Sequence, residues 1–352
     1  MMQSPLLLGL LAAVIWLSPA LAAKTRPPAL TAEAVNAAKW SARPGKGKLD
    51  PLVLKAQVLL DRARFSPGVI DARGGENFAK ALKAFQQANN LNATGKLDAA
   101  TWAKLAETSA EDVLTRYAIA ERDVKGPFER TIPKDFRQMA ELRRLAYRSP
   151  HELLAEKFHM SEDLLSALNG GTNFDSAGAE ILVAGVVPID GETKVSANRT
   201  KLARNGAPNS DAMASAAVRV EVNKSERSVR AYAKDGSLIA YYPASVGSAE
   251  KPAPSGRHTV REVARDPTYR YDPKYAFKGQ KTTQPVTVAP GPNNPAGLVW
   301  IALSAESYGI HGTSAPENVS KTESHGCIRL TNWDALALAK LVRKGTPVDF
   351  VD

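Results

Sequence analysis

The sequence predicts a multidomain protein with three parts: an N-terminal three-helix module, a small α/β segment, and a mainly-β C-terminal domain. Three observations predict this order. Apolar residues recur at helical spacing between residues 49 and 107, two short helices and a strand are indicated between 146 and 189, and apolar and polar residues alternate from residue 218 onward. At 352 residues the chain is long enough for two or three separate cores.

The first residues differ in composition from the rest of the chain. Residues 6–17 form an apolar run shorter than a membrane-spanning helix, followed by small residues at positions 20 and 22. This pattern predicts a cleaved signal peptide over residues 1–22, and therefore an exported protein without stable membrane insertion after cleavage. Residues 23–48 are rich in Pro, Ala, Gly and Lys and are expected to be a linker.

Basic residues outnumber acidic ones, which gives a formal net charge of +10. A basic exported protein is attracted to anionic polymers at the cell surface. The sequence contains no basic helix and no alternation of aromatic and basic residues, so a nucleic-acid partner is not expected.

Residues 49–107 are predicted to form three helices. The second of them is indicated by Phe78, Leu82 and Phe85. The stretch 84–91, with Thr94-Gly95 and Asp98-Ala99-Ala100-Thr101 behind it, resembles the three-helix peptidoglycan-binding module, and Gln57 and Asp71 fall where that family has its own Gln and Asp. The resemblance implies a peptidoglycan-binding-like domain; a helical spacer that binds nothing is the alternative.

The middle of the chain is expected to hold a helical connector over residues 108–145, to which no function is assigned. Residues 146–189, with two short helices, an Asn at position 169 and a strand near 179–183, resemble a LysM glycan-binding repeat. A purely structural domain is the alternative. Residues 190–217 are polar and rich in Ala, Asn and Gly, and are predicted to be a second linker.

Residues 218–352 are predicted to form an antiparallel sheet with one or two helices. Asp235-Gly236 signals a tight turn between two strands. One helix is expected over 333–343, with Thr331 at its start. The expected strands are 218–222, 228–232, 238–242, 258–263, 286–289, 299–303 and 348–351.

The candidate chemistry lies between residues 311 and 329. Thiol catalysis requires a thiolate, a neighbouring imidazole and hydrogen-bond donors for the developing oxyanion. The only cysteine of the chain, Cys327, stands two residues after His325, and His311 precedes both. Arg329 lies on the same face as the thiol, where its charge can lower the thiol pKa or hold a substrate carboxylate.

A metal site formed by His311, His325 and Cys327 is a minor alternative. Two ligands that flank one glycine make a cramped pair, and no acidic residue stands in a typical supporting position. No cofactor is expected, because a nucleophile, a base and oxyanion donors are present in the sequence without one.

The pattern His311-Gly312-Thr313 followed by Ser324-His325-Gly326-Cys327-Ile328-Arg329-Leu330-Thr331-Asn332 resembles the signature of the L,D-transpeptidase catalytic family. The resemblance implies roles for six residues. Cys327 is the nucleophile, and His311 or His325 is the base, with His325 favoured. His311 and Gly312 line the substrate side and the Gly312 carbonyl orients an imidazole, while Arg329 sets the local charge and Ser324 holds the loop.

The family further implies acyl transfer on the peptidoglycan of the periplasm or cell wall. A thioacyl-enzyme forms when the bond between a stem diamino acid and D-Ala is cleaved, and an amine of a neighbouring stem then takes the acyl group. Water as acceptor makes the enzyme a carboxypeptidase, and a protein amine makes it an anchoring ligase. The segment 265–297 is a candidate lid that chooses among these acceptors. A cysteine hydrolase of cross-links and a catalytically inert wall-binding scaffold are the alternatives.

Overall fold

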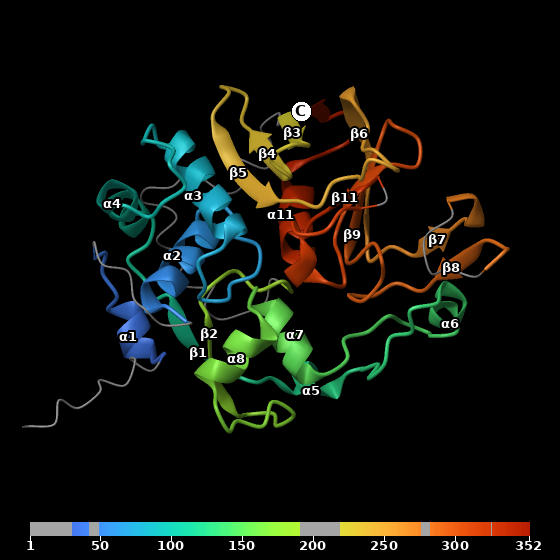
Figure 1. Ribbon diagram of the computed structural model, residues 1–352. Coiled ribbons are helices and arrows are strands. Elements are labelled where there is room, and N and C mark those ends of the chain that lie inside the picture. The colour runs from blue at the N-terminus through green and yellow to red at the C-terminus, as the bar shows by residue number, and fades with distance from the viewer. Residues whose placement is uncertain (1–29, 42–48, 191–218, 276–281, 325) are drawn as a thin grey trace, which may run out of the picture.

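The computed structural model describes residues 30–41, 49–190, 219–275, 282–324 and 326–352 (Figure 1). The predicted signal peptide, residues 191–217 of the second predicted linker and the site candidate His325 lie outside the described residues. Within the described part, none of the helices has the length and apolar character that crossing a bilayer requires.

Three helices form the N-terminal module, as the sequence predicts: α2 (Pro51–Arg62), α3 (Glu76–Ala88) and α4 (Ala99–Glu107). Asp50 begins α2 by accepting a hydrogen bond from the Leu52 amide at 2.8 Å. The buried Gln57 closes the loop after α2, since its amide donates to Asp71 Oδ1 at 2.8 Å and its oxygen accepts from the Ala72 amide at 2.8 Å. The two polar residues named from the sequence therefore hold one turn together.

The first predicted linker is wrong for residues 30–41, which contain the helix α1 (Ala32–Asn36). Val35 is fully buried against the helical module. The Asn36 side chain accepts from the backbone amides of Val113 and Leu114, each at 3.0 Å. This helix therefore forms because a buried side chain and a long-range hydrogen-bonding partner order it, and neither is visible in the local composition.

The predicted helical connector over 108–145 is also wrong in part. It begins with the strand β1 (Leu114–Ala118) and contains only two short helices, α5 (Glu121–Lys125) and α6 (Phe136–Ala140). The strand β1 pairs antiparallel with β2 (Glu180–Ala184), far along the chain. The pairing partner decides the conformation here, because an isolated strand has no local hydrogen bonds of its own.

The α/β segment thus has the order β1, α7 (Pro150–Lys157), α8 (Glu162–Leu168), β2. Asn169 closes it: its side chain accepts from the Leu182 amide at 2.6 Å and donates to the Leu182 carbonyl at 2.8 Å. Residues 119–149 form an excursion between β1 and α7, and we call them the excursion segment. In Figure 1 this segment leaves the α/β part and reaches the hairpin of β7 (Tyr269–Tyr271) and β8 (Val286–Val288).

An eight-stranded sheet forms the C-terminal domain, in the order β11-β10-β9-β6-β12-β3-β4-β5. Six of the seven strands expected from the sequence lie in this sheet, and the seventh, β8, pairs with β7 in a separate hairpin. The expectation of a purely antiparallel sheet is wrong, because β12 pairs with β3 and β10 with β11 in parallel. The bounds are β3 (Arg219–Asn223), β4 (Ser228–Tyr232), β5 (Leu238–Pro243), β6 (Gly256–Arg265), β7 (Tyr269–Tyr271), β8 (Val286–Val288), β9 (Val299–Leu303), β10 (Gly309–His311), β11 (Ile328–Arg329) and β12 (Pro347–Val351).

The helix α11 (Asn332–Leu341) packs on this sheet against β9 and β10. Thr331 caps it by accepting from the Asp334 amide at 3.1 Å, at the position expected from the sequence. The strands β7, β10 and β11 were not predicted, because each has three residues or fewer and shows no readable alternation.

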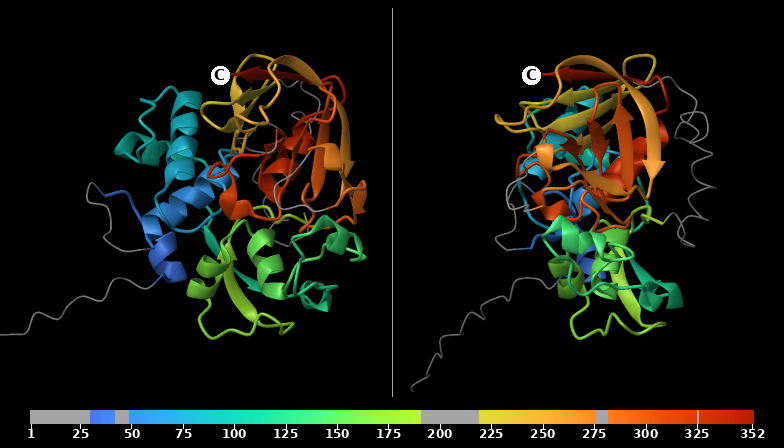
Figure 2. Two further views of the ribbon diagram at one scale, coloured as in Figure 1. Left: turned by 45° about the vertical axis from the view of Figure 1, so that its right-hand side comes forward. Right: turned by 90° about the vertical axis from the view of Figure 1, so that its right-hand side faces the viewer.

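The N-terminal parts are packed directly on the eight-stranded sheet. In Figures 1 and 2 the helix α3 lies beside β5, and α7 lies below α11. Backbone hydrogen bonds join the two parts, from Ser66 to the Tyr241 carbonyl at 2.9 Å and from Tyr241 to the Arg64 carbonyl at 2.8 Å. The α7 residue Glu156 accepts from Asn332 Nδ2 at 3.0 Å. The position of the α/β segment relative to the sheet is therefore set by specific polar contacts.

We predict that Asp123→Ala destabilises the α/β segment by about 2 kcal/mol, because the buried Lys157 loses one of its two carboxylate partners and keeps only the more exposed Asp190. Asp123 and Lys157 are almost fully buried and lie 2.8 Å apart. Urea denaturation followed by hydrogen exchange of β1 measures the loss.

Glu180→Ala is the matched control, since it removes an exposed ion pair with Arg116 worth less than about 1 kcal/mol. Equal losses for the two variants would contradict the prediction.

Candidate active site

The pairing of β10 with β11 brings the candidate residues together. The strands run parallel with Ile310 opposite Ile328 and His311 opposite Arg329. Side chains alternate between the two faces of a strand, so the two isoleucines point into the core while His311 and Arg329 share the other face. Cys327 lies two residues before Arg329 and faces the same way.

These side chains line a cavity of about 650 Å³, which we call the thiol cavity. It is bounded by residues from the sheet, from the β7 hairpin and from the excursion segment, among them Phe136, Tyr269, Trp300, His311, Cys327 and Arg329. Three of the six candidate residues therefore meet at one solvent-accessible space.

The loop before Cys327 is held in an unusual backbone conformation. Gly326 has φ +110°, and a Cβ there would come within 3.0 Å of Tyr308 Cε1. Ser324 Oγ accepts from the Gly326 amide at 3.1 Å and donates to the Cys327 carbonyl. Ser324 thus lies where a residue that holds this loop is expected.

His311 is a buried, oriented imidazole. Its Nδ1 lies 2.7 Å from the Gly312 carbonyl, which only accepts, so Nδ1 carries the proton and Nε2 is the basic nitrogen. The ring stacks on Trp300 with 5.2 Å between centroids. Burial lowers the pKa of His311 to about 3, aided by the charge of Arg329 and opposed by the Gly312 carbonyl. The imidazole is therefore neutral at physiological pH.

Gly312 is required for close packing rather than for flexibility. A Cβ at this position would lie 2.2 Å from Asn332 Oδ1. That oxygen accepts from the Leu298 amide at 3.0 Å, and the Asn332 amide group donates to the Pro292 carbonyl at 3.2 Å. Asn332 thereby fixes the backbone segment whose carbonyl orients His311.

The Cys327 thiol is partly exposed in the cavity. Burial raises its pKa above the ordinary value, while a backbone hydrogen bond from Gly309 and the charge of Arg329 act in the opposite direction. Burial also lowers the pKa of Arg329. Since the resting group is a thiol, a base must remove its proton before it can attack.

The sequence analysis missed Phe136, which forms one wall of the thiol cavity. Its ring centroid lies 4.8 Å from that of Tyr271 and 5.5 Å from that of Tyr269. Residues 267–270, 272 and 295–296 of the candidate lid also line the cavity. The only sequence signal for Phe136 is an aromatic residue in a charged stretch, which does not tell what it packs against.

The excursion segment is anchored beside the thiol cavity. The Leu145 amide donates to the Pro290 carbonyl at 2.9 Å, and the Leu145 carbonyl accepts from Asn293 at 2.9 Å. Arg144 and Asp266 form a two-pronged ion pair at 2.7 and 3.0 Å. The wall that carries Phe136 is thus connected to both ends of the β7–β8 hairpin.

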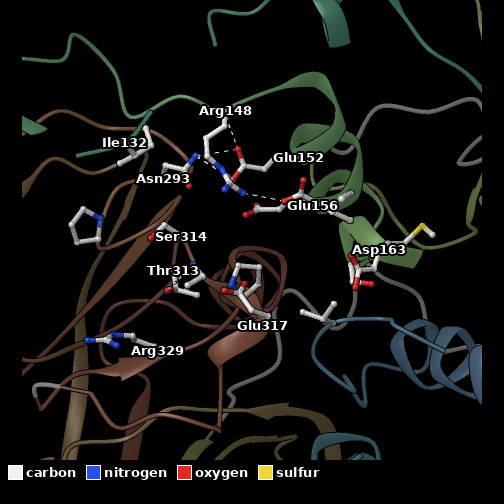
Figure 3. A pocket seen from close by; sticks show the side chains of 18 of the residues that line it. Ile132, Arg148, Glu152, Glu156, Asp163, Asn293, Thr313, Ser314, Glu317 and Arg329 are labelled. Atoms are coloured by element: carbon white, nitrogen blue, oxygen red, sulfur yellow. Dashed lines mark hydrogen bonds and ion pairs between the residues drawn. The ribbon is translucent and has the colours of Figure 1, made fainter. Parts of the chain in front are cut away.

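A second cavity of about 660 Å³ adjoins the first, and we call it the junction cavity. It shares Arg329 and Pro295 with the thiol cavity. Figure 3 shows its walls: Arg148, Glu152 and Glu156 on one side and Thr313, Ser314 and Glu317 on the other.

Among the described residues, no group of three or more His, Cys, Asp or Glu side chains could hold a metal ion. The metal alternative needs His325, which lies outside those residues.

Comparison with known proteins identifies two segments of the chain. Residues 217–350 match the family model of the "L,D-transpeptidase catalytic domain", and residues 50–105 match that of the "Putative peptidoglycan binding domain". The resemblances to the L,D-transpeptidase catalytic family and to the peptidoglycan-binding module are thereby confirmed, and the resemblance of residues 146–189 to a LysM repeat stays a prediction.

Curated relatives match over the catalytic segment. The "Putative L,D-transpeptidase YkuD" of Bacillus licheniformis is 33% identical over 130 residues, which are 37% of this chain and 63% of that protein. The "Probable L,D-transpeptidase YbiS" of Escherichia coli is 31% identical over 138 residues, 38% of this chain and 44% of that protein. The chain therefore spans less than two thirds of the length of either relative.

Among solved structures, L,D-transpeptidase 3 from Mycobacterium tuberculosis aligns with 39% of this chain and 62% of its own, at 19% identity and a TM-score of 0.33.

We predict that alkylation of Cys327 by iodoacetamide has its pH midpoint above that of an ordinary cysteine, because burial raises the thiol pKa. Arg329→Gln removes a nearby positive charge that favours the thiolate, so its midpoint moves to still higher pH. Rates measured by intact mass across a pH series test both statements.

Arg329→Lys keeps the charge and is the matched control. A midpoint that stays in place or falls in Arg329→Gln would show that the guanidinium does not act on the thiol.

Proposed function

Because residues 217–350 belong to the L,D-transpeptidase catalytic domain family, we propose that this protein cross-links peptidoglycan through a thioacyl intermediate on Cys327. One observation supports this most directly: a partly exposed thiol shares a cavity with a neutral imidazole whose basic nitrogen is Nε2. The substrates are the stem peptides of the cell wall, and the protein is exported to it.

The first step is removal of the thiol proton by His311 Nε2. The Cys327 thiolate attacks the carbonyl between the stem diamino acid and its terminal D-Ala, which forms the carbon–sulfur bond. Backbone amides near Gly326 and Cys327 stabilise the oxyanion. The carbon–nitrogen bond then breaks, and the imidazolium returns its proton to the departing D-Ala amine.

In the second step, an amine of a neighbouring stem attacks the thioester. Its proton passes to His311 as the new carbon–nitrogen bond forms, and the Cys327 sulfur leaves as a thiolate that recovers the proton. Arg329 stabilises negative charge on sulfur in both steps, since it lies on the same face of β11.

We assign the base to His311 rather than to His325, which the sequence pattern favoured. The assignment is supported by the orientation of the ring, which the Gly312 carbonyl and Trp300 hold from two sides. The imidazole is neutral throughout the physiological range, so Nε2 carries no proton and can accept one.

Two alternatives share parts of this chemistry. An inert wall-binding scaffold predicts a thiol sealed in a core, whereas Cys327 is partly exposed and lines a cavity. A carboxypeptidase or hydrolase uses the same thioester and differs only in taking water as the acceptor. The helical domain at 50–105 and the LysM-like segment are proposed to hold the enzyme on glycan strands.

Incubation with a carbapenem followed by intact mass measurement tests the nucleophile and the base. We expect a stable adduct on the unmodified protein and none on Cys327→Ala. His311→Ala should acylate about 10² to 10⁴ times more slowly, the usual contribution of a general base.

His325→Ala serves as the comparison, with a smaller expected effect. If His325→Ala were the slower variant, the base assignment would be wrong. If no adduct formed and Cys327 also resisted iodoacetamide, the enzymatic function itself would be refuted.

We also predict that Phe136→Ala raises KM for a stem tetrapeptide by about fivefold, the value of one aromatic contact, and leaves kcat nearly unchanged. The ring lines the donor's cavity but touches no reacting group. Steady-state release of D-Ala measures both constants.

Phe136→Tyr keeps the ring and should restore KM, while Phe174→Ala, in the α8–β2 loop, should have no effect. A fall in kcat without a change in KM would mean that Phe136 acts through the fold instead.

A further inference from the structure

We propose that the junction cavity is the binding site of the acceptor stem, and that it takes an amine-bearing side chain. This inference rests on the proposed function. A transferase must admit two substrates to one carbonyl, and the donor's leaving group and the incoming amine need separate space. The structure has two cavities of similar volume, about 650 and 660 Å³, that meet at Arg329 and Pro295.

The border between the cavities lies at the catalytic residues. His311 lines the thiol cavity, and Thr313, two residues later, lines the junction cavity. Arg329 contributes to both. An amine that enters through the junction cavity therefore arrives next to the base that must take its proton and next to the strand that carries the thioester.

Half of the junction cavity is supplied by the N-terminal part of the protein. The helices α7 and α8 and the end of the excursion segment contribute Arg148, Glu152, Glu156, Glu162 and Asp163. The opposite wall comes from the loop after β10, with Thr313, Ser314 and Glu317. Figure 3 shows these two walls facing each other, with Arg329 and Asp163 at opposite sides of the space between them.

The walls that face each other are held rigidly, as an acceptor site needs. Asn332 donates to Glu156 at 3.0 Å, and Asn293 donates to the Ala146 carbonyl at 2.8 Å. Both contacts join the catalytic domain to the segment around α7. The cavity is thus a built feature of the assembled chain, and the catalytic domain alone lacks one of its walls.

The charges change sign along the junction cavity. Arg148 is already paired with Glu152 at 2.9 Å and with Glu162 at 3.0 Å. Asp163 and Glu317 are exposed and form no ion pair with the described residues, whereas the half-buried Arg329 lies where this cavity meets the thiol cavity. The exposed end of the junction cavity, at Asp163 and Glu317, is its mouth and attracts a cation.

The end of the junction cavity that meets the thiol cavity disfavours a cation. The positive charge of Arg329 disfavours an ammonium ion and so favours the neutral amine, which is the form that attacks the thioester. A stem diamino acid, with an amine at the end of a flexible side chain, matches this order of charges. Water needs no such site, so the cavity argues for transfer over hydrolysis.

The thioacyl-enzyme reacts either with an acceptor amine or with water, and the ratio of the two products tests the inference. The full-length protein is supplied with a disaccharide tetrapeptide as donor and acceptor, and cross-linked dimer and hydrolysed tripeptide are quantified together. Ser314→Trp fills the cavity, and Glu317→Lys reverses the charge at its mouth. Each should lower the ratio of dimer to tripeptide by about tenfold. For Glu317→Lys this is the effect of losing one charge-assisted contact, and for Ser314→Trp it follows from the lost space.

Two controls separate the possible causes. Glu107→Lys makes the same charge change on the exposed side of α4 and should leave the ratio unchanged. Capture of the thioacyl-enzyme by hydroxylamine, which is too small to need the cavity, should be equally fast in all variants.

An unchanged ratio in both variants would overturn the inference and leave the proposed function standing. An equal loss of hydroxylamine capture would overturn it too, since the defect would then lie in the thioester itself. Failure of the proposed function is distinguishable, because the unmodified protein would then form neither product.

Discussion

The parallel pairing of β10 and β11 is the constraint on which the site depends. It aligns His311 with Arg329 and leaves Cys327 on the same face, although 16 residues lie between the end of β10 and the start of β11. A slip of β11 by one residue would turn Cys327 and Arg329 into the core, because side chains alternate along a strand. The buried Ile328 opposes that slip, since it would then have to face the cavity.

Asn332 extends this constraint to the rest of the molecule. Its oxygen occupies the space that side chains at positions 297 and 312 would need, and its amide group reaches Glu156 on α7. Burial raises the pKa of Glu156 to about 8, and the hydrogen bond from Asn332 opposes that rise. One buried amide thus connects the backbone that orients the imidazole to the helix that forms a wall of the neighbouring cavity.

The N-terminal parts contribute walls to both cavities. The excursion segment provides Phe136 to the thiol cavity, and α7 and α8 provide one side of the junction cavity. Both contributions depend on packing between segments more than 100 residues apart in the chain. The shape of the space around the thiol is accordingly a property of the assembled domains.

The sequence by itself determined the three-helix module, most strands of the C-terminal sheet and the candidate nucleophile, because local periodicity and one compact motif around Cys327 indicate them. It did not reveal α1, β1 or the parallel pairs, whose stability comes from partners far along the chain. Nor did it reveal Phe136 or the junction cavity. Cavities and their walls arise where separate elements meet, so only the tertiary structure decided which residues surround the thiol.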